Sequence, residues 1–130
     1  MIVVDASALL ESLLRTPAAE AVERRLFDPR QTLHVPHLLD VEVAQVLRRY
    51  TAKCEIDRER CHMALADLAD FPLRRYPHDF LLPRIWDLRN NMTAYDAAYV
   101  ALAEALDAPL LTRDRRLAAA AGYHAQIELL

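Results

Sequence analysis

The sequence has 130 residues, of which 54% are hydrophobic, and a formal net charge of -3. This length predicts a single domain over residues 1–130, and the apolar fraction is ample for one core. The negative charge argues against a protein that coats nucleic acid without specificity, because such binding depends on neutralising phosphates with lysine and arginine.

The spacing of the cysteines, the single glycine and the short apolar runs exclude further classes of protein. Cys54 and Cys61 form neither a metal-binding CxxC pair nor a disulfide framework, which favours a reduced, cytoplasmic setting. Gly122 is the only glycine, so the phosphate-binding loop, the dinucleotide fingerprint and the serine-hydrolase elbow are all absent. No apolar run approaches the roughly 18 residues of a membrane span, and we expect neither a leader nor a membrane anchor.

The chain opens on a short apolar run, IVV at residues 2–4. Three β-branched residues without alternation are typical of a strand that is covered on both faces in a parallel sheet. Asp5 follows at the end of the strand, where ligands bind in such sheets, and Ser7 lies in the first turn of a helix predicted from Ala6 to Arg15. A cap for this helix explains Asp5 equally well.

The next stretch predicts a helix from Pro17 to Phe27 and a short strand from Leu33 to Val35. A third helix contains LLDVEVAQVLRRY, whose apolar residues recur at helical spacing. Glu42 lies at the edge of its apolar stripe, although a side chain in such a place commonly reaches out to water. No third ligand joins His34 and His37, so we expect both to be surface loop histidines.

The middle of the chain is predicted to be structural. A helix is expected from Ile56 to Phe71, a third strand from Pro72 to Tyr76 and a helix from Phe80 to Arg89. Trp86, on the last of these, is expected in the core, because aromatic side chains on helices usually pack there.

The stretch NNMTAYDAAYVALAEALDAPLLTRD carries two further acids. Thr93 and Asp96 resemble a capping box in front of a helix from Ala97 to Leu106. A fourth strand over residues 110–111 ends near Asp114, and a helix from Arg115 to Ala121 is expected to close at Gly122. The segment from residue 125 to 129 is a candidate fifth strand at the edge of the sheet.

Four carboxylates converge in this arrangement. Asp5 and Asp114 both follow buried strands, and a parallel sheet brings such positions to one edge. Glu42 and Asp96 lie early in helices that must pack beside that edge. Crowded carboxylates repel, so one or more would be protonated unless cations neutralised them, and oxygen ligands favour Mg²⁺ or Mn²⁺. Such a cluster suits phosphodiester hydrolysis by activated water.

Four segments with these acids resemble the motifs of the PIN-domain ribonucleases, most closely the VapC-type toxins of toxin–antitoxin pairs. They are IVVDASALL, VEVAQVLRR, TAYDAAYVALA and LLTRDRRLA, and the resemblance extends from Ile2 to about Leu117. Position by position, the four acids of the family's site match Asp5, Glu42, Asp96 and Asp114. Hydroxyl positions that support the site in the family match Ser7, Thr93 and Thr112.

This resemblance implies a three-layer α/β/α sandwich around a parallel sheet of four or five strands. It also implies an endoribonuclease that depends on Mg²⁺ or Mn²⁺ and forms a homodimer. The resemblance further implies a cognate VapB-like antitoxin and is compatible with a larger toxin–antitoxin assembly. Three arginines beside the last acid are candidates for holding the phosphates of RNA: Arg113, Arg115 and Arg116.

Two alternatives remain open at this point. A receiver-like, phospho-accepting signalling domain is also α/β with acids at strand ends. It needs an acid pair near the first helix and a lysine after a late strand, whereas the only lysine here, Lys53, lies mid-chain. A PIN fold without activity that serves only as a binding module is the second alternative, and the presence of all four acids argues against it.

Overall fold

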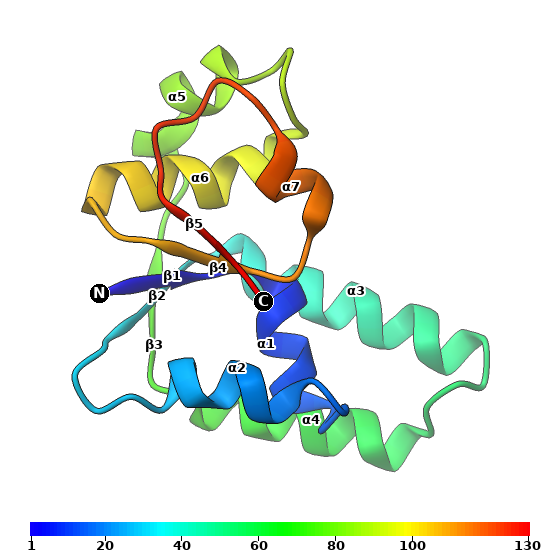
Figure 1. Cartoon of the computed structure of the whole chain (residues 1–130). Helices are drawn as coiled ribbons and strands as arrows, with labels where there is room; N and C mark the ends of the chain where they lie inside the picture. Colours follow the sequence, from blue (N-terminus) through cyan, green and yellow to red (C-terminus); the bar gives the residue numbers. More distant parts are fainter.

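Five parallel strands form the sheet of the computed structural model, which describes residues 1–130 (Figure 1). The elements in chain order are β1 (Ile2–Val4), α1 (Ala6–Leu13), α2 (Ala19–Leu26), β2 (Leu33–Pro36), α3 (Leu38–Ala52), α4 (Arg58–Asp70), β3 (Leu73–Tyr76), the 3-10 helix η1 (Asp79–Leu81), α5 (Leu82–Asp87), α6 (Ala94–Leu106), β4 (Leu110–Thr112), α7 (Arg115–Ala119) and β5 (Ile127–Leu129). Helices α1, α2 and α4 lie on one side of the sheet and α5, α6 and α7 on the other (Figure 1). The expected α/β/α sandwich is confirmed.

Strand β1 is the centre of the sheet, whose order is β3-β2-β1-β4-β5. All three of its residues are fully buried, as the uninterrupted apolar run predicts. Val3 pairs with His34 of β2 on one side and with Leu110 of β4 on the other. Because every strand runs in the same direction, their carboxyl ends share one edge, where α1, α3 and α7 begin (Figure 1).

Helix α6 packs closely on the sheet because its buried face is rich in alanine. Its buried residues run without a break from Ala97 to Ala103. Tyr99 is the largest of them and is fully buried. The helix begins three residues earlier than predicted, and Thr93 caps it by accepting a hydrogen bond of 3.2 Å from the Asp96 amide.

Several helix ends differ from the predicted ones. Helix α1 stops at Leu13, because Arg15 adopts a left-handed conformation with φ of 52° and turns the chain. The predicted helix from Phe80 to Arg89 divides into η1 and a six-residue α5. Helix α7 ends at Ala119, where Ala120 becomes extended, so Gly122 is not its cap.

Two side-chain predictions are wrong. Trp86 is 67% exposed, because Leu81 and Leu88 supply the core contacts of this region, and the Arg89 guanidinium lies 4.9 Å from the Trp86 ring centre. His34 is a buried residue of β2 with only 1% exposure. Its ring nitrogens lie 2.8 Å from the Thr32 hydroxyl and 2.7 Å from the Tyr76 hydroxyl, so strand pairing hides this polar group. None of the helices is long and apolar enough to cross a membrane.

Candidate functional site

A pocket of about 340 Å³ lies at the carboxyl edge of the sheet, between α1 and α3. All four predicted acids line it, each from a different part of the chain. The other lining residues are Ala6, Ser7, Leu10, Glu11, Leu14, Thr16, Val46, Arg49, Tyr50 and Arg113. The fold therefore brings together four carboxylates that are up to 109 positions apart in the sequence.

Asp5 is the most buried of these acids, with 6% exposure. It occupies the N-cap position of α1, but its side chain makes no capping hydrogen bond. Instead its Oδ2 accepts hydrogen bonds of 2.6 Å from Thr112 Oγ1 and 2.8 Å from Ser7 Oγ. Burial raises the pKa of Asp5, and the two hydroxyls oppose this rise by favouring the carboxylate. The Ser7 backbone amide also favours the carboxylate, but the hydroxyl contacts show that helix capping alone does not explain Asp5.

The same two hydroxyls connect Asp5 to the chain that follows β4. Ser7 Oγ accepts a hydrogen bond of 3.0 Å from the Arg113 amide, and Thr112 Oγ1 accepts one of 3.0 Å from the Asp114 amide. Each hydroxyl thus donates its proton to Asp5 and accepts a hydrogen bond from a backbone amide. Thr93, the third predicted hydroxyl, does not line the pocket and acts as the cap of α6.

Glu42 and Asp96 reach the pocket from α3 and α6. Burial, opposed by the Tyr99 hydroxyl and aided by the charges of Asp5 and Asp96, raises the pKa of Glu42 to about 7. Burial is also the main cause that raises the pKa of Asp96, followed by the charges of Asp5 and Asp114, while the Thr93 side chain and then the charge of Arg116 oppose the rise. The acids are close enough to feel one another as like charges.

Asp114 differs from the other acids because it is also a helix cap. Its Oδ1 accepts hydrogen bonds of 2.8 Å from the Arg116 amide and 3.4 Å from the Leu117 amide. Of the three predicted arginines, only Arg113 lines the pocket. Arg116 lies outside the lining, but its positive charge lowers the pKa of Asp96. Arg115 is exposed and is absent from the lining.

The pocket also contains residues that the sequence reasoning missed. Glu11 accepts a hydrogen bond from the Thr16 hydroxyl, and its Oε1 lies 3.5 Å from Arg113 Nε. Arg49 and Tyr50 line the far end of the cleft on α3. The spacing of four residues between Ser7 and Glu11 on α1 was an available signal, because such residues share a helix face.

The donor set is suited to a hard divalent cation, since all four converging side chains are carboxylates. No protein hydrogen bond ends on Asp5 Oδ1, and Glu42 Oε1 is buried without any hydrogen-bond partner. These oxygens are therefore available as ligands. No group of three histidine, cysteine, aspartate or glutamate side chains is already arranged to hold a metal ion.

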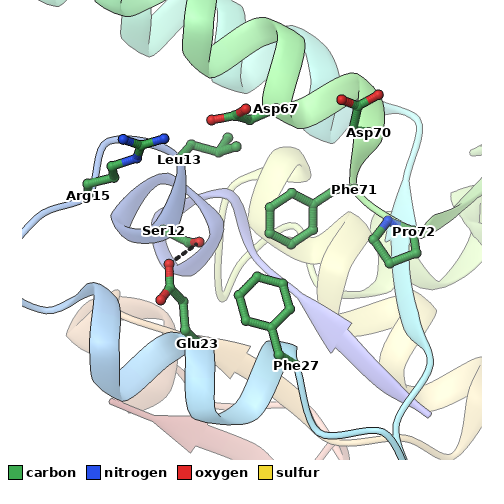
Figure 2. A pocket seen from close by; sticks show the side chains of 9 residues that line it. All are labelled: Ser12, Leu13, Arg15, Glu23, Phe27, Asp67, Asp70, Phe71 and Pro72. Atoms are coloured by element: carbon green, nitrogen blue, oxygen red, sulfur yellow. Dashed lines mark hydrogen bonds between the residues drawn. The ribbon is translucent and has the colours of Figure 1, made fainter.

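A second pocket, shown in Figure 2, is formed by α1, α2 and α4 and contains none of the predicted site residues. The rings of Phe27 and Phe71 stack in it with centres 5.7 Å apart. Ser12 donates a hydrogen bond of 2.8 Å to Glu23 at its wall. Of its three acids, Glu23 already accepts the Ser12 hydrogen bond, and Asp67 and Asp70 both come from α4, so this pocket is the weaker candidate for catalysis.

Comparison with known proteins gives consistent matches. Residues 2–123 match the family model of the PIN domain. Ribonuclease VapC1 of Mycobacterium tuberculosis is 46% identical over 129 residues, which cover 98% of this chain and 96% of that protein. Ribonuclease VapC12 of the same organism is 42% identical over 130 residues, covering 100% and 99%. The crystal structure of PAE2754 from Pyrobaculum aerophilum superposes with a TM-score of 0.70 at 26% identity, covering 97% and 81%.

The first prediction separates the acids by their effect on stability. Asp5→Asn and Asp96→Asn should leave the thermal stability of metal-free protein unchanged or raised, because each relieves like-charge crowding. Asp114→Ala should lower the free energy of unfolding by about 1 kcal/mol, because α7 loses its cap. Asp87→Asn, an exposed acid outside the pocket, is the control. Thermal unfolding in EDTA measures all four, and unfolding caused by Asp5→Asn would assign that residue a structural role.

The second prediction concerns pH. Between the ordinary pKa of 4.5 and the folded value of about 7, Glu42 holds a proton in the folded chain that the unfolded chain has lost. The free energy of unfolding of metal-free protein should therefore fall as the pH rises through this window. Urea unfolding at pH 5 and pH 8 measures the fall, and Glu42→Gln should reduce it. An equal fall in the variant would contradict the assignment to Glu42.

Proposed function

Because this chain belongs to the PIN-domain family and is a ribonuclease of the VapC type, we propose that it holds Mg²⁺ or Mn²⁺ at its four acids. Asp5, Glu42, Asp96 and Asp114 are the proposed ligands, and RNA is the proposed substrate. The family membership removes the receiver-like alternative. A VapC-type ribonuclease is the toxin of a toxin–antitoxin pair, and we propose that it acts in the cytoplasm, where RNA is available.

One observation supports this proposal above the others. Four carboxylates from separate elements line one pocket, and neither lysine nor histidine is among the lining residues. The pocket thus lacks the histidine pair that would activate a 2'-hydroxyl of RNA, and it has the oxygen ligands that divalent cations prefer. Cations bound there would supply an activated water and neutralise charge on the phosphodiester.

Polar residues in and beside the pocket orient these groups. Ser7 and Thr112 fix the Asp5 carboxylate in place through two hydrogen bonds. Arg113 is fixed at its backbone by Ser7 and at its side chain by Glu11, and its guanidinium is the proposed contact for a substrate phosphate. Arg116 adds positive charge beside Asp96.

The proposed partners are a VapB-like antitoxin and a second copy of this chain. The cleft between α1 and α3 combines apolar Leu10, Leu14 and Val46 with the acids at its end. An amphipathic helix can bury its apolar face along α1, α2 and α3 and extend an arginine or lysine to the carboxylates. For the homodimer, the exposed apolar side chains of Phe80, Leu82 and Trp86 supply a candidate face.

The third prediction tests the reaction. Purified protein should cut RNA only with Mg²⁺ or Mn²⁺ and leave 3'-hydroxyl and 5'-phosphate ends, because water rather than the 2'-hydroxyl attacks. Sequencing of the RNA ends measures this, with Asp5→Asn as the inactive control. Cleavage in excess EDTA, or products with cyclic phosphate ends, would contradict this mechanism. Equal, background-level cleavage by wild type and Asp5→Asn would favour the inactive binding module.

The fourth prediction concerns the arginines. Arg113→Gln should weaken RNA binding and reduce the salt dependence of the affinity, because a phosphate contact is lost. Replacement of Arg115 or Arg116 should also weaken binding, with the smallest effect at Arg115, because both lie outside the pocket lining but only Arg116 acts on the charge of a pocket acid. Binding to uncleavable RNA at several salt concentrations gives these slopes. An unchanged slope in Arg113→Gln would reassign this residue to the solvated surface.

The fifth prediction locates the antitoxin. In the purified complex, hydrogen exchange should slow in α1 and α3, and the chain should need more Mn²⁺ for thermal stabilisation, since a basic side chain occupies the acid cluster. Alanine at that basic position of the partner should restore cation binding. Protection of α4 without α3 would instead place the partner in the pocket of Figure 2 and contradict the proposed cleft.

A further inference from the structure

Two buried polar atoms near the acid pocket have no hydrogen-bond partner: the Tyr99 hydroxyl and Glu42 Oε1. Tyr99 is 0% exposed and is among the largest fully buried side chains of the protein. Buried polar groups are nearly always paired, because an unpaired one has lost its hydrogen bonds to water without a replacement. Two such atoms therefore call for a common explanation.

The two residues approach each other from different helices. Asp96 and Tyr99 are three residues apart on α6, so they lie on one face of the helix, with Asp96 in the pocket and Tyr99 in the interior. Glu42 extends from α3 and lines the same pocket. The Tyr99 hydroxyl and the Glu42 carboxyl are neighbours, and the backbone amide of Ala6 is the other polar group beside this hydroxyl. A donor and an acceptor that are both buried and unpaired thus lie side by side.

We propose that Tyr99 is a positioning residue: when a cation is bound, its hydroxyl donates a hydrogen bond to the Glu42 carboxylate and fixes the orientation of this carboxylate toward the cation. The proposal rests on the proposed function, in which Glu42 is a ligand. A phenol has one proton to donate and an ionised carboxylate has only lone pairs, so the two groups are complementary. Residues that hold a metal ligand in this way typically change metal affinity by about 10- to 100-fold when they are mutated.

The test uses Tyr99→Phe, which removes the hydroxyl and keeps the ring. The Mn²⁺ concentration that gives half-maximal thermal stabilisation should rise about tenfold or more relative to wild type. Without metal, the melting temperature should stay unchanged or rise, because the lost hydroxyl has no partner. Tyr95→Phe is the matched control, since it removes the same group from a 63% exposed position of the same helix and should not change the midpoint.

A second pair of variants shows whether the effect passes through Glu42. Glu42→Gln should raise the Mn²⁺ midpoint, and adding Tyr99→Phe to it should raise the midpoint no further. An unchanged midpoint in Tyr99→Phe beside a raised one in Glu42→Gln would overturn the role of Tyr99 alone. An unchanged midpoint in Glu42→Gln would overturn the proposed ligand as well. Loss of metal-free stability in Tyr99→Phe would also contradict the proposal, because it would show a structural partner for the hydroxyl.

Discussion

The carboxyl edge of the sheet is built around one constraint, the burial of the Asp5 carboxylate among other acids. Desolvation and like charges both disfavour an ionised group there. Hydrogen bonds to a charged group each contribute about 1.5–3 kcal/mol, and Asp5 receives two of them, from Thr112 on β4 and Ser7 on α1. The same hydroxyls accept backbone amides after β4, so the orientation of Asp5 and the path of the chain toward α7 are set together.

The four acids differ in what they contribute to the fold. Asp114 caps α7 and therefore supports local structure whether or not a cation is present. The pKa of each of the other three is raised, first by burial, which means that the folded chain resists their ionisation. Protein stability alone gives no reason to keep three such carboxylates in one pocket. A cation-binding site does give such a reason, because a bound cation would neutralise the crowded carboxylates. Departures from local stability rules are common at functional sites.

The sequence predicted the sheet and the convergence of the acids because both depend on local patterns. A β-branched run followed by an acid, as in Ile2–Val4 and Asp5, specifies a buried parallel strand and a polar end. Trp86 and His34 were predicted wrongly because their burial depends on partners distant in sequence, such as Tyr76 for His34. Tyr99 could not be assigned to Glu42 from sequence, since periodicity identifies a helix face and not the side chain that meets it.

The pairing of Arg113 completes the electrostatic arrangement of the pocket. A guanidinium beside a cluster of carboxylates would bind two of them and occupy the place of a cation. Arg113 is the residue between Thr112 and Asp114, yet its ion pair is made with Glu11 on α1, and none of the four acids forms a salt bridge. Helix α1 thus contacts groups of both charges. Ser7 donates a hydrogen bond to Asp5, and Glu11, one turn later, pairs with Arg113. This separation leaves the acids open to a cation while the positive charge stays within the same pocket.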